Sequence, residues 1–324
     1  MKMLMFWIVM GILLLILTLI TVTAYVCFYL VFYVSPRRRR AEQKDRYAIP
    51  SGPIYEPHRE LMIQWMKDTD AAPHEEVSIT SFDGLTLRGK LYEYAPDAPI
   101  ELMFHGYRGN ARRDLCGGIR RCFSLGRSAL IVDQRACGDS DGHVITFGVN
   151  ESRDCLSWLA FMTERFGPRR PIYLTGISMG AATVMMATAK PLPPNVIGVL
   201  ADCGYTSAKD IIKKVVRDMK LPPTLLYPFI RLGARLFGHF DLEETPPIEA
   251  MKACRLPILF IHGDGDDFVP CDMSRQNHAA CSAKKGLVTV PDTGHGLAYL
   301  KDPEAYIKAL ADFFGDPLSK ETTV

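Results

Sequence analysis

The sequence of 324 residues has no internal repeat, no low-complexity tract and no Cys-x-x-Cys or Cys/His spacing of the kind that binds metal. Its nine cysteines are odd in number and scattered, which argues against a disulfide framework and against a zinc site. We therefore expect reduced, mostly buried thiols, no metal and no cofactor. Hydrophobic residues at 48% and charged residues at 23% are ordinary values, so a disordered chain and a polytopic membrane protein are also excluded.

Most of the chain also lacks an excess of positive charge. The formal net charge is +2, but residues 1–46 alone carry +5, which leaves −3 for the rest. A slightly acidic body lacks the excess of positive charge that binds phosphate backbones, so we expect no nucleic-acid partner.

The N-terminal region contains no charged residue from Met3 to Val34. At about 1.5 Å per residue this run exceeds the roughly 30 Å hydrocarbon core of a bilayer. Trp7 lies near its start and Tyr25, Tyr29 and Tyr33 near its end, where aromatic rings settle at membrane interfaces. A cleaved signal peptide is the alternative, but its apolar region is usually about 7 to 15 residues long. The run predicts a single transmembrane helix.

Basic residues follow this segment: Arg37–Arg40, Lys44 and Arg46, against Lys2 alone before it. The positive-inside rule then predicts a single-pass protein of the cell membrane with the body of the chain on the cytoplasmic side. The arginine run is either a simple stop-transfer flank or a site for anionic lipid headgroups.

We expect five segments along the chain. They are an anchor with its basic flank at 1–46, a proline-containing linker at 47–76, one globular domain at 77–315, a helical cap inserted in it at about 205–253, and a tail at 316–324.

The domain alternates short apolar runs with longer helical patterns, which is typical of an α/β protein with a mostly parallel sheet. Helical patterns are expected at about 112–125, 151–165, 179–189, 272–280 and 303–314. The expected strands are Val77–Ser81, Leu85–Leu91, Ile100–Phe104, Ala129–Val132, Ile172–Thr175, Val196–Ala201, Ile258–Ile261 and Leu287–Val290.

A Gly-x-Ser-x-Gly motif, Gly176 to Gly180, follows the expected strand Ile172–Thr175 and precedes a helix. In this context the serine, Ser178, sits on a strained elbow, and only glycines at the flanking positions let the strand and helix pack closely. Ser178 is the candidate nucleophile, and the helix after it favours developing negative charge.

A serine nucleophile needs a base that is oriented by a carboxylate, and in this arrangement the acid precedes the histidine along the chain. Three acids follow the strand Leu256–Ile261: Asp264, Asp266 and Asp267. The residues alone leave the choice among them open.

The candidate base is His295, which lies between Gly294 and Gly296 just past the last strand. Two other histidines at strand ends, His105 and His262, come before the position that the base requires. The sequence therefore predicts a Ser–Asp–His triad.

These motifs resemble the α/β-hydrolase superfamily, in particular its membrane-anchored members with a compact cap, which are similar to esterases, lysophospholipases and thioesterases. The resemblance covers roughly residues 77–315. In that group the acid stands in His-Gly-x-x-Asp-x-x-Val-Pro, and His262-Gly263, Asp266 and Val269-Pro270 match it position by position. The resemblance thus selects Asp266, with Asp267 as the second choice.

The resemblance also implies an oxyanion hole made by two backbone amides, those of Met179 and of Tyr107 in the loop His105–Asn110. In the alternative interpretation, Tyr107 is not a donor and its ring simply covers the pocket. The segment from Asp133 to Gly142 resembles a structural Asp-x-Arg-Gly-x-Gly-x-Ser-x-Gly loop, in which we expect Asp133 and Arg135 to pair.

The function implied is that of a serine esterase, carboxylesterase- or lipase-like, acting on a small acyl ester or lipid substrate through an acyl-serine intermediate. Thioesterase and serine-peptidase activity on the same triad and a non-catalytic interaction module are the alternatives. Part of the cap's apolar surface, including Phe229 and Phe237, is expected to line an acyl pocket that favours medium chains. Oligomeric state and protein partners are not indicated by any pattern.

Overall fold

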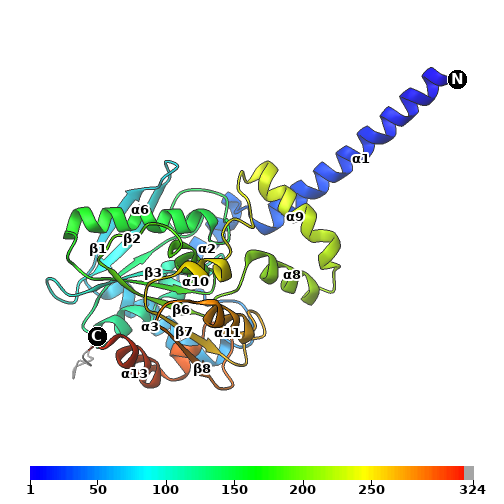
Figure 1. Cartoon of the computed structure of the whole chain (residues 1–324). Helices are drawn as coiled ribbons and strands as arrows, with labels where there is room; N and C mark the ends of the chain where they lie inside the picture. Colours follow the sequence, from blue (N-terminus) through cyan, green and yellow to red (C-terminus); the bar gives the residue numbers. More distant parts are fainter. Residues whose placement is uncertain (317–324) are drawn as a thin grey trace.

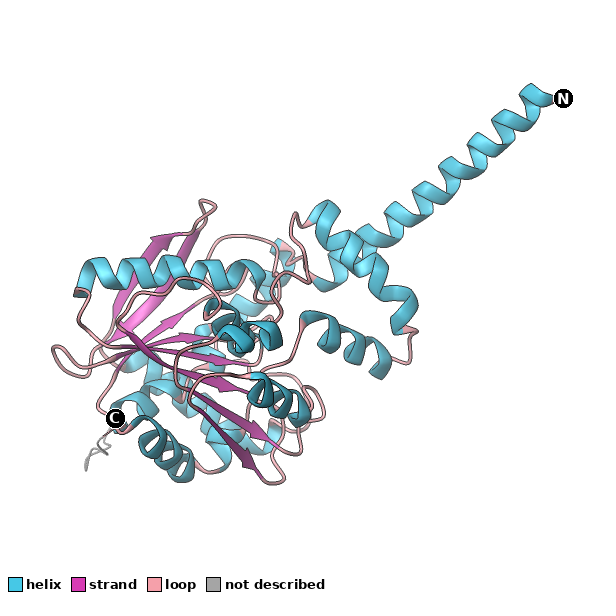
Figure 2. Cartoon of the chain, viewed as in Figure 1, coloured by secondary structure: helices cyan, strands magenta, loops and turns pink. Residues whose placement is uncertain are grey.

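A mostly parallel β-sheet runs through the centre of the molecule (Figures 1 and 2). The computed structural model describes residues 1–316, and these contain one eight-stranded sheet in the order β1-β2-β4-β3-β5-β6-β7-β8. The β1–β2 and β2–β4 pairs are antiparallel, and all other pairs are parallel. The strands are β1 Glu75–Thr80, β2 Thr86–Tyr92, β3 Ile100–Phe104, β4 Ser128–Val132, β5 Ile172–Ile177, β6 Val196–Asp202, β7 Ile258–Gly263 and β8 Lys285–Val290.

The central strands are buried on both faces because helices cover both sides of the sheet. Every residue of β3, β4 and β7 is buried, which explains their continuous apolar runs. On one face α6 Val149–Phe166, α7 Met179–Ala187 and α10 Pro247–Ala253 complete the main core. On the other face α5 Gly118–Ser124 and α13 Pro303–Phe314 cover the sheet. The predicted α/β-hydrolase architecture with an eight-stranded, mostly parallel sheet is confirmed. Shorter helices are α4 Ala111–Asp114, α11 Cys271–Ala280 and α12 Ala298–Lys301.

The N-terminal helix α1 (Lys2–Val31) projects far from the sheet (Figure 1). It is long and apolar enough to cross a membrane. Its side chains are exposed from Lys2 to Leu19, whereas Ala24, Phe28 and the following Phe32 are buried. The last turns of α1 are therefore packed into the domain and do not belong to the projecting part.

The inserted segment between β6 and α10 forms α8 (Ala208–Asp218) and α9 (Pro223–Phe237). Helix α9 lies across the end of α1 (Figure 2). A Cβ atom at Gly233 would come within 2.4 Å of the Ala24 carbonyl oxygen, so only glycine permits this close crossing. The cap is thus packed against the C-terminal part of α1.

The segment expected to be a linker contains regular structure. It holds α3 (Arg59–Ala71), and in the basic flank before it the arginine run forms helix α2 (Pro36–Lys44) after the N-cap Ser35. Trp65 and Met66 of α3 are buried. The expected tail falls, apart from Asp316, outside the described residues.

Candidate functional site

Ser178 occupies a strained turn between β5 and α7. Its φ is 58°, a left-handed value that is unusual for a residue with a side chain. A Cβ atom at Gly176 would lie 2.0 Å from the Gly180 carbonyl oxygen, and one at Gly180 would lie 2.0 Å from the Phe104 oxygen. The two motif glycines therefore allow β5, α7 and β3 to meet at this point, which holds Ser178 at the carboxyl end of the sheet.

The structure brings Ser178, His295 and Asp266 together in one chain of hydrogen bonds. The distance from Ser178 Oγ to His295 Nε2 is 2.9 Å, and that from His295 Nδ1 to Asp266 Oδ2 is 2.6 Å. Each residue stands in a loop at the carboxyl end of a strand, since Asp266 follows β7 and His295 follows β8. An aromatic ring, that of Phe268, packs edge-on to the imidazole with 5.0 Å between centroids.

The carboxylate of Asp266 is buried and fully hydrogen-bonded. Its Oδ1 accepts from the amides of Phe268 and Val269 at 2.9 and 2.8 Å, while Oδ2 accepts from His295 and His262. Burial by itself raises the pKa of this carboxyl, but the hydrogen bonds from His262 and His295 outweigh it and hold the pKa well below its ordinary value. Asp266 is therefore an anion at neutral pH.

The neighbouring acids lie elsewhere. Asp267 is exposed, and its backbone carbonyl accepts a hydrogen bond from Lys214. Asp264 accepts from the Asp292 amide at 2.7 Å and so shapes the turn. Of the three acids in this turn, only Asp266 contacts His295 within the described part of the chain.

His262 supports the carboxylate of Asp266, a role that the sequence pattern did not indicate. Its ring is fully buried, its Nε2 lies 3.1 Å from Asp266 Oδ2 and 2.9 Å from the Val269 carbonyl oxygen, and its Nδ1 lies 2.7 Å from Ser274 Oγ. Two acceptors at Nε2 require the proton there, so Nε2 donates to the carboxylate and Nδ1 accepts from the serine hydroxyl. The available sequence signal was that His262 stands four residues before Asp266. Whether the two side chains meet depends on how the loop between them turns.

The loop His105–Asn110 passes beside Ser178 and is hydrogen-bonded to the end of α1. A Cβ atom at Gly106 would lie 3.5 Å from Ser178 Cβ. Tyr107 Oη donates to the Val31 carbonyl at 2.6 Å, and Arg108 Nη2 donates to the Leu30 carbonyl at 2.7 Å. Burial raises the pKa of Tyr107 to about 12, so its hydroxyl keeps the proton that it donates. These bonds satisfy carbonyls at the C-terminal end of α1, which have no partner within the helix.

Asp114 also fixes the loop His105–Asn110. Its Oδ2 accepts from the Gly106 amide at 3.0 Å, and its Oδ1 accepts from Arg113 Nε at 2.6 Å. Burial acts to raise the pKa of Asp114, but the charge and hydrogen bond of Arg113 reverse this effect and lower it. A Cβ atom at Gly109 would overlap this carboxylate at 1.9 Å, which explains a glycine there. The sequence pattern did not single out Asp114.

Ser178 and His295 open into a cavity of about 630 Å³. One wall comes from the segment 50–55, where Tyr55 Oη donates to the His295 carbonyl at 3.1 Å and the Ile54 side chain would meet a Cβ at Gly294 at 3.1 Å. The other walls include Trp65, Leu115, Ile177, Phe268, Tyr299 and Leu300. Aromatic and aliphatic side chains thus line much of the space beside the serine.

The cap contributes little to this cavity. Among the described residues that line it, those from the inserted segment are Lys214 and Asp218 of α8, and none comes from α9. Phe237 instead packs against Tyr25 and Phe28 of α1, with ring centroids 5.2 and 5.9 Å apart. The expectation that Phe229 and Phe237 line an acyl pocket is therefore wrong, because Phe237 packs on α1 and neither residue lines the cavity.

The Asp133–Gly142 loop is structural, but its expected ion pair does not form. Asp133 accepts from the amides of Ala111 and Asp139 at 2.8 and 2.9 Å. Arg135 instead makes a bidentate pair with buried Asp154 at 2.7 and 2.6 Å, and a second with Asp83. The two residues brace different neighbours and still fix the loop beside the elbow.

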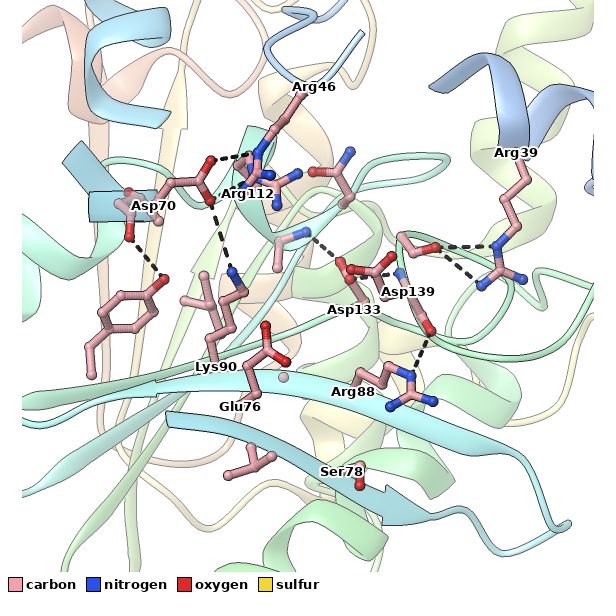
Figure 3. A pocket seen from close by; sticks show the side chains of 18 residues that line it. Arg39, Arg46, Asp70, Glu76, Ser78, Arg88, Lys90, Arg112, Asp133 and Asp139 are labelled. Atoms are coloured by element: carbon pink, nitrogen blue, oxygen red, sulfur yellow. Dashed lines mark hydrogen bonds and ion pairs between the residues drawn. The ribbon is translucent and has the colours of Figure 1, made fainter. Parts of the chain in front are cut away.

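A second cavity, of about 570 Å³, lies between β2, α3 and the basic segment that follows α1 (Figure 3). Within it, Arg46 and Arg112 each donate to Asp70, at 3.0 and 2.9 Å, and Lys90 Nζ lies 3.9 Å from the same carboxylate. Arg39 of α2 donates to the carbonyls of Gly138, Ser140 and Gly142. These contacts tie the basic flank to the domain.

Possible metal ligands meet only within the Ser178 site among the described residues. The ligand atoms of Cys203, Asp266 and His295 lie within 4.8 Å of one another. Burial raises the pKa of the Cys203 thiol well above its ordinary value, which keeps it neutral and a poor ligand. Asp266 and His295 are already bonded to each other, so this cluster does not fit a metal.

Comparisons with known proteins agree with this fold. Residues 102–309 match the model of the alpha/beta hydrolase family. The chain is 28% identical over 251 residues to protein bem46 of Schizosaccharomyces pombe, covering 75% of this chain and 77% of that one. It is 26% identical over 238 residues to the uncharacterized protein YqkD of Bacillus subtilis, covering 72% and 77%.

Solved structures give the same result. The esterase Pf2001 of Pyrococcus furiosus superposes with a TM-score of 0.64 at 19% identity, covering 84% of this chain and 97% of that one. The esterase EaEST of Exiguobacterium antarcticum gives 0.57 at 16% identity, covering 74% and 99%. The family model spans most of the sheet and includes Ser178, Asp266 and His295, so the chain belongs to the α/β hydrolase family.

Proposed function

We propose that this protein is a membrane-anchored serine hydrolase that cleaves carboxylic esters through an acyl-serine intermediate. The observation that carries the proposal is the connected series of hydrogen bonds from Ser178 through His295 to Asp266, in which Ser178 and His295 line a largely apolar cavity. Relatives in fold that are named esterases support the choice of substrate class. An apolar cavity suits the acyl part of an ester.

In the acylation step, Ser178 Oγ attacks the ester carbonyl carbon while His295 Nε2 takes the hydroxyl proton. The carbonyl π electrons move to oxygen, and the resulting oxyanion is stabilised by the amides proposed as donors, those of Met179 and Tyr107. Asp266 stabilises the imidazolium through the hydrogen bond at Nδ1. The tetrahedral intermediate then collapses, the bond to the alcohol oxygen breaks, and His295 returns its proton to that oxygen.

Deacylation repeats these steps with water. His295 takes a proton from the water, whose oxygen attacks the acyl-serine carbonyl, and the bond to Ser178 Oγ breaks with return of the proton to the serine. The products are the carboxylic acid and the regenerated enzyme.

We propose that α1 is the anchor, with the basic flank and the catalytic body on the cytoplasmic side. The roughly 22 residues from Lys2 to Thr23, which precede the buried part of α1, span about 33 Å at about 1.5 Å per residue. This length matches a hydrocarbon core of about 30 Å.

The test is turnover and labelling of the full chain in detergent. Ser178→Ala and His295→Ala should each lower hydrolysis of p-nitrophenyl esters by several orders of magnitude, and the double variant should lose little more than either single one. A fluorophosphonate probe should label wild type and not Ser178→Ala. Near-normal turnover in His295→Ala would contradict the triad, and preferred turnover of acyl thioesters or aminoacyl-arylamides would redirect the substrate class.

A further inference from the structure

Helix α9 has two apolar faces, and only one of them is used inside the protein. Tyr227, Ile230 and Ala234 are buried on the inner face. The other face carries an outer stripe, which we define as Leu225, Phe229, Leu232 and Leu236. Their spacing of four, three and four residues places them on one side of the helix.

The outer stripe is exposed to an extent that is unusual for large apolar residues. Leu225 is 61% and Leu236 is 48% exposed, while Phe229 and Leu232 are partly exposed. The turn that precedes α9 adds Met219 and Leu221, at 64% and 43% exposure. A contiguous exposed apolar surface of this kind marks an interaction site.

The position of α9 along α1 identifies the partner. Gly233 contacts α1 at Ala24 and Phe28, where the exposed, projecting part of α1 ends. If the projecting part crosses the bilayer, as proposed above, this crossing point lies at the level of the membrane surface. Helix α9 lies across α1 there (Figure 1) and not alongside it, so it runs along that surface.

The direction of the outer stripe agrees with this placement. The inner face of α9 packs on α1 and on the core that contains Phe147, Tyr205 and Ile212. The outer stripe points the opposite way around the helix, away from the catalytic domain. On the remaining flank Arg231 and Arg235 form ion pairs with Asp241 and Glu243, so the stripe has a polar border on one side and α1 on the other.

We propose that α9 is an in-plane membrane helix whose outer stripe inserts into the headgroup and upper acyl region of the bilayer that α1 crosses. This proposal rests on the anchoring role of α1 and goes beyond it, because it gives the domain a second lipid contact. Two contacts fix the orientation of the domain, which a single helix cannot do. The turn at 219–222 connects α9 to α8, whose Lys214 and Asp218 line the Ser178 cavity. The cavity is thereby held next to the lipid surface, where an acyl ester can enter without crossing bulk water.

Tryptophan quenching by brominated lipids tests the proposal with the full chain in phosphatidylcholine vesicles. Leu225→Trp places a fluorophore on the outer stripe, and Thr224→Trp is the matched control, since Thr224 is also exposed but lies on another side of α9. The signal is the difference from wild type, whose Trp65 and Trp158 are buried in the domain and whose Trp7 reports on α1. We expect the added Leu225→Trp fluorescence to be quenched severalfold more than that of Thr224→Trp, most strongly by bromines near the headgroup end of the chains.

The controls separate the two proposals. Quenching of Trp7 without selective quenching at Leu225→Trp would overturn the in-plane helix and leave the anchor intact. Absence of Trp7 quenching would overturn the anchor and the in-plane helix together. As a second readout, Leu225→Glu with Leu236→Glu should lower turnover of a vesicle-embedded ester severalfold while leaving turnover of a soluble short-chain ester near wild type; equal turnover of the embedded ester would contradict the proposal.

Discussion

The C-terminal end of α1 is expected to be part of the folded hydrolase domain. Ala24, Phe28 and Phe32 are buried against the cap and the core. The Val34 amide donates to the His143 carbonyl at 2.8 Å, and the Ile145 amide donates to the Phe32 carbonyl at 2.9 Å. Removing residues 1–34 would break these contacts and also release the Tyr107 loop from its bond to α1.

The magnitude follows from these contacts. A buried phenylalanine is worth about 3 kcal/mol or more, and each hydrogen bond contributes about 1 kcal/mol. Loss of Phe28, Phe32 and two or more hydrogen bonds then costs about 8 kcal/mol, comparable to a total stability of about 5–15 kcal/mol. For a domain of this size the unfolding midpoint would fall by about 20 °C. Removing residues 1–20, whose side chains are almost all exposed, should cost little.

The assay compares three chains in one mild detergent: the full chain, 21–324 and 35–324. Thermal unfolding and turnover of a short soluble ester are measured for each. The 21–324 chain should match the full chain, whereas 35–324 should unfold far earlier and lose turnover. Phe32→Ala in the full chain, with the exposed Leu15→Ala as its control, separates packing from truncation. If 35–324 keeps the melting temperature and turnover of the full chain, the last turns of α1 are not part of the domain.

Four further predictions concern the triad acid, His262 and the basic flank. Asp266→Asn should lower kcat by about 10⁴-fold, as loss of a triad carboxylate does elsewhere, while Asp267→Asn should stay within a few fold of wild type in the same ester assay. Because the pKa of Asp266 is lowered in the folded state, its contribution to stability is fully present above the ordinary pKa of an aspartate and is lost as pH falls toward the lowered pKa. The difference in the free energy of unfolding between wild type and Asp266→Asn, measured in urea, should therefore be constant near neutrality and shrink only below about pH 4. His262→Phe should lower kcat about tenfold with little change in KM, and a KM effect alone would contradict a positioning role for this ring. Neutral residues at Arg37–Arg40 should weaken the orientation of the protein in a reporter-fusion assay, and a wild-type body on the outer side would refute the proposed topology.

The sheet could be predicted from the sequence because its strands are short apolar runs between turn residues. The bounds were less predictable, and β8 begins two residues earlier than expected, since Lys285 and Gly286 give no apolar signal although they pair with β7. The elbow was predictable because its pattern is local: the turn at Ser178 brings β5, α7 and β3 so close that Gly176 and Gly180 have no room for a Cβ atom. The relation between Ser178, Asp266 and His295 depended on chain order and on resemblance, and their distances could come only from the fold.

What the sequence did not predict involves contacts between distant segments. Nothing local marks Tyr55 as a neighbour of His295 or Asp114 as a support for Gly106. The apolar residues of α9 are periodic in the sequence, but periodicity does not say what a face packs against. Here one face packs against α1 and does not line the Ser178 cavity. The inference of an acyl pocket therefore failed at the step from amphipathic helix to binding site.

Residues 50–55 form one wall of the cavity, and this role restricts the length of the connection between α2 and α3. Surface connections between elements usually tolerate insertions, because a longer loop adds little entropy cost and disturbs nothing. Here an added residue between α2 and α3 would move Tyr55 away from the His295 carbonyl and Ile54 away from Gly294, and the cavity would change shape. Insertions and deletions in this stretch should therefore be rare among orthologues with the same substrate, and where they occur they should accompany a change of substrate.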